Sequence, residues 1–183
     1  MLSIAIIIAL VFGFYNGYRR GLLMQLIRLI GYIVSIVLAT KFYEPLTKIV
    51  EMLVPFPSIQ QDTQLAVYNE SVSFVLDQAF YRVITFVLIG LIGWLLTNFI
   101  SLFFSKLKYY NFFWKQANYL AGGAINLVIT YGVVFLFLFI LSLIPIEFIQ
   151  QQFVDNPLAY WIVSQTPILS DTAIEAWLQV NPF

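Results

Sequence analysis

The chain contains no cysteine and no histidine, and these two absences limit its chemistry. Without cysteine it can form neither disulfides nor thiolate metal sites. Without histidine it lacks the commonest general base and the commonest side-chain metal ligand. The acidic pairs Glu44/Glu51 and Asp171/Glu175 have no base, metal-type cluster or phosphate-binding loop beside them. We therefore expect no enzyme, no bound metal and no cofactor.

Charged residues are also scarce. They make up 10% of the 183 residues, whereas 61% are hydrophobic. An average soluble domain is about 25% charged and roughly 45–50% apolar. The formal net charge is zero, so nothing attracts the chain to nucleic acid. The composition predicts an all-α integral membrane protein whose first partner is the lipid bilayer.

Four apolar runs predict four transmembrane helices in a single domain, over about residues 2–18, 22–42, 83–104 and 117–144. The apolar stretch 2–15 of the first run reaches only about 21 Å as a helix, which is short of the ~30 Å hydrocarbon core. Extension through Tyr18 lets the following arginines snorkel to the headgroups. The alternative is a helix lying partly in the interface.

Proline and apolar periodicity indicate what lies between and after these runs. Pro45 is expected to end the second helix, because the residue before a proline avoids the α region. We predict amphipathic segments outside the membrane at 46–54, 65–80 and 146–180. In the last of these, Thr172 and Glu175 have the spacing of a helix capping box.

Glycines recur at helical spacing in several of these runs. Gly13, Gly17 and Gly21 lie four residues apart, so they would form a strip without side chains on one helix face. Another helix can approach such a strip closely. Gly90 and Gly93 predict a similar notch in the third run. The expected helix-packing residues are Gly13, Gly17, Gly21, Gly31, Gly122 and Gly123.

Basic residues predict the topology. The two short connections hold Arg19 and Arg20, and Lys106, Lys108 and Lys115, with no acidic residue in either. The positive-inside rule places both connections in the cytoplasm and both termini outside. Inverted topology is the alternative. The same five residues are suited to anionic lipid headgroups.

Three polar residues within the runs are candidates for function: Arg28, Asn98 and Asn126. Arg28 shares a helix face with Gln25 and Tyr32, which predicts a polar stripe toward other helices. It either anchors its helix by snorkelling or serves a pathway or a lipid headgroup. The asparagines either hydrogen-bond between helices or contact a solute.

The order of these features resembles the CvpA (colicin V production protein) family of bacterial inner-membrane proteins. The resemblance rests on Gly13-x3-Gly17-x-x-Arg20-Gly21 after a short apolar run, and on a second run ending in Phe42-Tyr43-x-Pro45. Asn118-Tyr-Leu-Ala-Gly122 is similar to the family's Asn/Asp-Arg-x-x-Gly-x-x-x-Gly pattern. Here Tyr119 replaces the arginine, Asn126 replaces the second glycine, and Ser3 or Ile4 stands where members often carry aspartate.

The resemblance implies a multi-pass protein of the bacterial inner membrane. It would be an accessory or scaffold factor for colicin V or other toxin production or export and for envelope homeostasis. Its partners would be other membrane or secretion proteins, or further copies of itself. The residues also leave open a small oligomeric channel or transporter, with a polar path near Arg28, Asn98 and Asn126.

Overall fold

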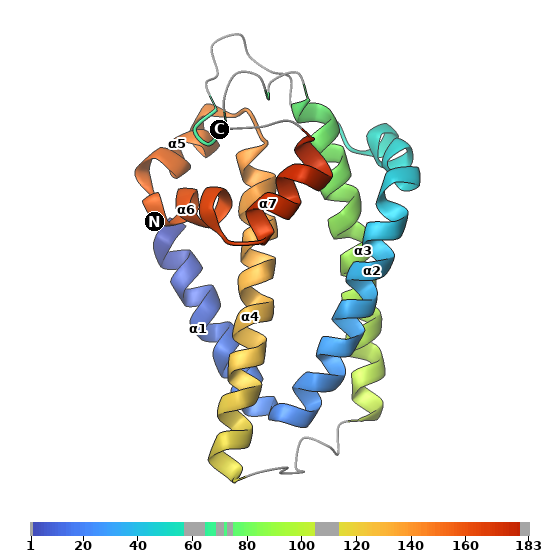
Figure 1. Ribbon diagram of the computed structural model, residues 1–183, viewed down its shortest axis with the longest axis vertical. Coiled ribbons are helices and arrows are strands. Elements are labelled where there is room, and N and C mark those ends of the chain that lie inside the picture. The colour runs from blue at the N-terminus through green and yellow to red at the C-terminus, as the bar shows by residue number, and fades with distance from the viewer. Residues whose placement is uncertain (1, 57–64, 69–71, 73–74, 105–113, 180–183) are drawn as a thin grey trace. The chain divides into compact units, whose positions relative to one another are not determined.

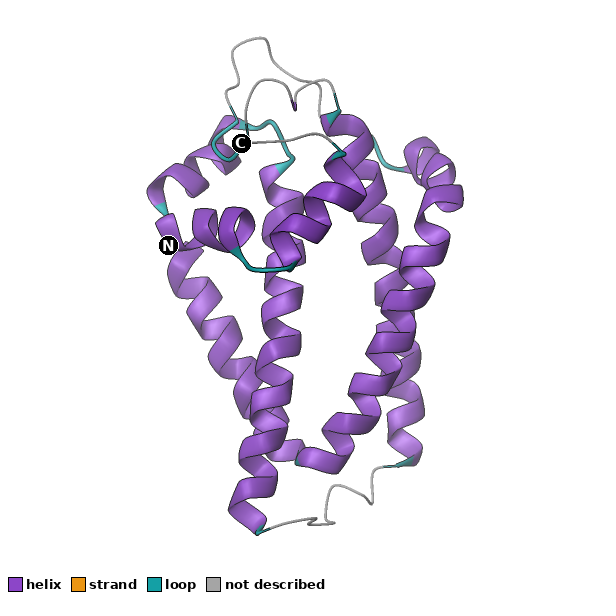
Figure 2. Cartoon of the chain, viewed as in Figure 1, coloured by secondary structure: helices purple, strands orange, loops and turns teal. Residues whose placement is uncertain are grey.

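The computed structural model describes residues 2–56, 65–68, 72, 75–104 and 114–179 (Figure 1). Every regular element in this part of the chain is helical, and Figure 2 shows no strand there. The elements are α1 (Leu2–Arg20), α2 (Leu22–Leu53), α3 (Leu76–Phe103), α4 (Lys115–Ser142), α5 (Glu147–Asp155), α6 (Pro157–Gln165), α7 (Leu169–Ala173) and a π-helix, η3 (Ile174–Leu178). Four of them, α1 to α4, are long and apolar enough to cross a membrane. The all-α membrane class is confirmed.

The prediction that Pro45 ends the second helix is wrong. Helix α2 runs through Pro45 to Leu53, so the segment predicted at 46–54 is mostly its last turns. The buried side chains of Tyr43 and Val50 lie on either side of the proline. Packing of both keeps the chain in helical register there, and such packing routinely overrides local propensity.

The helix predicted over 65–80 is also wrong in its first half. Helix α3 begins at Leu76, and the residues described before it, 65–68, 72 and 75, are not α-helical. Val67, Tyr68 and Val72 are nevertheless buried. Their apolar side chains therefore belong to a core rather than to one face of a surface helix. Residues 69–71 and 73–74 lie outside the described part of the chain.

The chain forms two compact units. The first unit comprises residues 1–4, 43–86 and 135–183. Its aromatic core centres on Trp177, whose ring centroid lies 5.1 Å from that of Phe86 and 5.4 Å from that of Phe139. Phe139 and Phe153 are among its fully buried side chains. Burial of such rings supplies much of the packing energy of a core.

Buried polar side chains fasten the connections of this unit. The amide of Gln150 donates to the carbonyls of Ser142 (3.2 Å) and Ile144 (2.7 Å) and accepts from the backbone N–H of Ala66 (2.9 Å). The hydroxyls of Tyr68 and Ser142 share a hydrogen bond of 2.8 Å. Burial raises the pKa of Tyr68 well above its ordinary value, which keeps the phenol neutral.

The end of η3 is held by two side chains from the long helices. Arg82 donates from Nη1 to the Trp177 carbonyl at 3.1 Å, and the Tyr43 hydroxyl donates to the Ala176 carbonyl at 3.4 Å. A cation at a helix C-terminus is favourable, because the free carbonyls there carry partial negative charge. The predicted capping box at Thr172 is wrong, since α7 already begins at Leu169 with Ile168 as its N-cap. Thr172 therefore lies inside the helix.

The second unit comprises residues 5–42 and 87–134. It contains no aspartate or glutamate in its sequence, so all nine acidic residues of the chain belong to the first unit. Seven of the nine basic residues belong to the second unit. The two units therefore have opposite charge.

Ile168 offers a test of the fold in the first unit. Its φ of 70° and ψ of −51°, with the Leu169 N–H donating to the Pro167 carbonyl at 2.8 Å, form a classic γ-turn, which is strained for a β-branched residue. The side chain is 76% exposed, so little packing is lost with it. We expect Ile168→Gly to raise the free energy of unfolding by about 1 kcal/mol in detergent.

The control for this prediction is Val154→Gly, which removes an exposed β-branched side chain from α5. It should lower the free energy of unfolding by roughly 0.5–1 kcal/mol, because glycine disfavours a helix. Equal losses in the two variants, measured by thermal unfolding, would contradict the assignment of strain.

Candidate functional site

Helices α1 and α4 approach each other through glycine. Gly13 and Gly17 are the buried glycines of α1. A Cβ added to Gly13 would lie 2.7 Å from Cβ of Thr130, and one added to Gly17 would meet the Gly122 backbone. A Cβ on Gly122 would lie 2.7 Å from the carbonyl carbon of Gly21. The two backbones are therefore in direct contact, which only small residues allow.

Gly21 packs closely against α4 as the sequence pattern predicted, but it lies one residue beyond the end of α1 rather than on that helix. It lies between α1 and α2 with φ of +77°, a conformation that glycine adopts without steric cost. Its N–H donates to the Gly17 carbonyl at 3.1 Å, and its carbonyl accepts from the Gln25 N–H at 3.2 Å. This single residue thus ends one helix and starts the next.

Helices α2 and α3 pack through a reciprocal pair of small residues. Gly31 of α2 faces Thr97, and Gly93 of α3 faces Ser35. The predicted notch is half present, since nothing lies within 4 Å of a Cβ built on Gly90. In α4, a Cβ on Gly123 would lie 2.7 Å from the ring of Phe14.

Asn126 joins three helices of the second unit. Its Nδ2 donates to the Gly13 carbonyl of α1 at 2.6 Å, and its Oδ1 accepts from Nε2 of Gln25 in α2 at 2.7 Å. Gln25 is fully buried and Asn126 is buried. We call Gly13, Gln25 and Asn126, which these two hydrogen bonds join, the amide relay. Hydrogen bonds of this kind hold membrane helices together with roughly 0.6–2 kcal/mol each.

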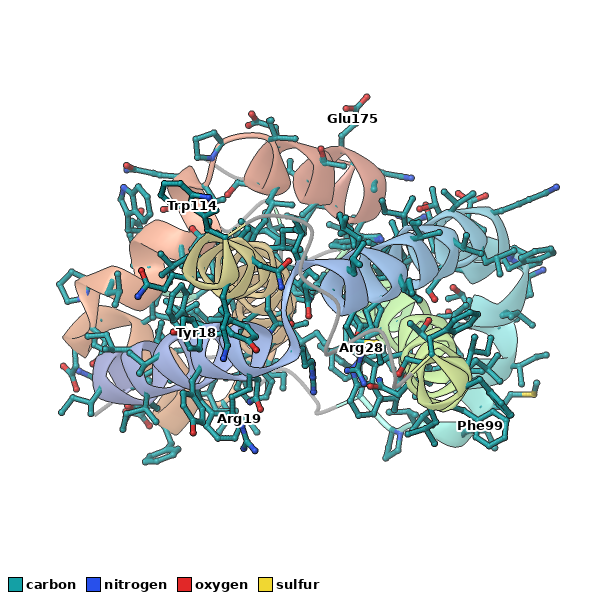
Figure 3. The ribbon with its side chains drawn as sticks, turned by 90° about the horizontal axis from the view of Figure 1, so that it is seen from below. Tyr18, Arg19, Arg28, Phe99, Trp114 and Glu175 are labelled. Atoms are coloured by element: carbon teal, nitrogen blue, oxygen red, sulfur yellow. The ribbon has the colours of Figure 1, made fainter. Side chains whose placement is uncertain are left out.

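Arg28 follows Gln25 by one helical turn and lies between α2 and α3 (Figure 3). It is only 8% exposed, and its Nη2 donates to Oγ of Ser101 at 3.0 Å. Ser101 in turn donates to the Asn98 carbonyl at 2.7 Å. Two buried polar atoms beside this contact have no hydrogen-bond partner, Nε of Arg28 and Oε1 of Gln25.

The three predicted polar residues therefore have different positions. Arg28 and Asn126 are both next to Gln25, one by helical spacing and the other by a hydrogen bond. The Asn98 amide donates to the Trp94 carbonyl of its own helix at 2.7 Å. Sequence reasoning placed Gln25 and Arg28 on one polar stripe toward other helices, but it missed Ser101. The available indication for Ser101 was its position as a polar residue near the end of an apolar run.

The basic residues predicted in the two short connections differ in exposure. Arg19 is exposed, with its guanidinium 5.7 Å from the Tyr15 ring centre. Arg20 is half-buried. Lys115, the first residue of α4, is exposed. Lys106 and Lys108 lie outside the described residues. In the described part of the chain, no group of three or more acidic side chains is placed to hold a metal ion.

Comparison with known proteins agrees with a membrane protein. A family model described as colicin V production protein matches residues 2–167. The chain is 30% identical over 182 residues to the uncharacterized transmembrane protein YshB of Bacillus subtilis (strain 168), and the match covers 98% of each chain. No solved structure matches significantly. The chain belongs to the colicin V production protein (CvpA) family.

The α1–α4 contact can be tested with two glycines of the same helix. Gly122→Ala adds a methyl group against the backbone of Gly21, so it should lower the free energy of unfolding by about 1–3 kcal/mol. Gly132→Ala adds the same group where nothing lies within 4 Å, and it should stabilise the helix by roughly 0.5–1 kcal/mol. Thermal unfolding in detergent measures both. Matching behaviour of the two variants would contradict backbone contact at Gly122.

Proposed function

We propose that this protein is a non-catalytic accessory or scaffold factor of the bacterial cytoplasmic (inner) membrane. It would support colicin V or other toxin production or export, and envelope homeostasis, through other membrane or secretion proteins or through copies of itself. Membership of the CvpA family supports the process. The hydrogen bonds and close glycine contacts between the spans support a scaffold role.

The observation that carries this proposal is the amide relay. Both polar atoms of the Asn126 amide are hydrogen-bonded to other helices, to Gly13 and to Gln25. A side chain engaged in this way stabilises the bundle and has little capacity left to bind a passing solute. The relay favours a rigid scaffold over a transport path.

The outer faces of the same helices offer surface for lipid or for a protein partner. Large apolar side chains remain exposed along α1 and α2. They include Ile8, Val11 and Phe12 of α1, and Ile30, Val34 and Val37 of α2. A membrane scaffold needs such faces, because helix association in lipid depends on close packing.

The test is complementation in a host that produces a colicin V-type toxin. Deletion of the gene should reduce the secreted toxin titre and growth in sublethal detergent, and the wild-type gene should restore both. Gly132→Ala should also restore both, whereas Gly122→Ala should restore less at equal membrane abundance, because it disturbs the bundle. A deletion that changes neither property would overturn the proposal.

A small oligomeric channel or transporter is the second candidate. The unpaired buried atoms of Arg28 and Gln25 favour it, since a polar path needs groups that are free to bind. Ion flux through purified protein in liposomes that disappears with Arg28→Leu would favour the channel over the scaffold.

We further propose that both termini lie outside and both basic connections lie in the cytoplasm. Seven of the nine basic residues belong to the second unit, which contains both short connections, and this distribution supports the orientation. Ser3 near the start of α1 donates to Oδ1 of Asn156 at 3.1 Å, which supports a shared side for the N-terminus and the tail.

Reporter fusions test this topology. Alkaline phosphatase, which is active only outside the cytoplasm, should be active when fused after Phe183 and inactive when fused at Lys108. Green fluorescent protein should give the opposite pattern at the same two positions. An active phosphatase at Lys108 would show that the protein is inverted.

A further inference from the structure

Arg28 is a buried cation without a carboxylate in its own unit. The next acidic residue along α2 is Glu44, about 24 Å away at helical rise. Every other acidic residue also belongs to the first unit. An uncompensated buried charge is costly in a membrane helix, so a counter-charge from outside the chain would stabilise it.

The hydrogen bonds of the amide relay fix which buried polar atoms beside Arg28 are left without a partner. Nδ2 of Asn126 donates to the Gly13 carbonyl, so its Oδ1 must accept from Gln25 Nε2. Oε1 of Gln25 is then left as an acceptor, and Nε–H of Arg28 is left as a donor. The two residues lie three apart on α2 and so share a helix face. A ligand for this face must both accept and donate a hydrogen bond.

The position of Arg28 also points to a headgroup-level ligand. Ser101, its hydrogen-bond partner, lies two residues before the end of α3. Arginine is well suited to phosphate, because its guanidinium presents several donors in a fixed plane.

We propose that Arg28 and Gln25 form a binding site for a phosphate that carries a hydroxyl group. A phosphate oxygen accepts from Nε–H of Arg28, and the hydroxyl donates to Oε1 of Gln25. Two sources share this chemistry: the glycerol-phosphate headgroup of an anionic phospholipid, and dissolved hydrogen phosphate. This site is additional to the proposed scaffold function and does not depend on it.

The experiment titrates purified full-length protein in nonionic detergent and follows its thermal unfolding midpoint. The probes are short-chain phosphatidylglycerol, phosphatidylmethanol with the same charge but no headgroup hydroxyl, phosphatidylcholine, and inorganic phosphate against chloride at equal ionic strength. Saturable stabilisation by phosphatidylglycerol, weaker by phosphatidylmethanol and absent with phosphatidylcholine, is the result expected for a lipid ligand. Stabilisation by inorganic phosphate but not by chloride identifies a dissolved ligand.

Three variants connect the effect to the site. Arg28→Gln should weaken binding at least about tenfold, because a charge-assisted hydrogen bond is lost. Lys41→Gln removes one exposed positive charge from the same helix and should leave affinity within about twofold. Ser101→Asp places a carboxylate opposite Arg28, so it should abolish binding while keeping the arginine paired. This last variant keeps the test decisive if Arg28→Gln does not fold.

The proposal is overturned by any of three results. Neither phosphate source stabilises the wild-type protein, which would leave a buried water as the partner of the two atoms. Phosphatidylcholine stabilises as well as phosphatidylglycerol. Alternatively, the Ser101→Asp variant binds the probes as well as the wild type.

Discussion

The hydrocarbon core of a bilayer offers no hydrogen bonds, so polar groups within the spans are stabilised by partners inside the protein. Oε1 of Gln25 lacks such a partner in the described part of the chain. The amide relay otherwise meets this requirement and joins three helices, through the hydrogen bonds of Asn126 to Gly13 and Gln25. It depends on the absence of side chains at Gly13 and Gly17, because only then can α4 come close enough for Asn126 to reach a backbone carbonyl. The close packing of α1 and α4 is therefore what allows the hydrogen bond from Asn126 to Gly13 to form.

Hydropathy predicted the class and the four candidate spans, because the membrane's thickness demands long apolar runs. Two boundaries were wrong for a common reason. Pro45 lies inside α2, and Val67, Tyr68 and Val72, before the start of α3, are buried without being α-helical. In both places contacts distant in sequence determine the local structure, and periodicity within a short window does not contain them.

The candidate site was predicted only in part. Arg28 and Asn126 stood out because polar residues are rare in apolar runs, and the structure brings both next to Gln25. Ser101 and the different setting of Asn98 depend on how α3 is rotated about its axis. A single sequence specifies which residues share a face of one helix, but not which neighbour that face meets.

Gly21 alone connects α1 and α2, so this connection cannot absorb a change in its length. One residue inserted there would rotate the residues of α2 by about 100° around the helix axis. Gln25 and Arg28 would then rotate away from Asn126 and Ser101 toward the hydrocarbon. The turn therefore fixes the rotation of α2 about its own axis relative to α1. Its length is as constrained as any side chain in the bundle.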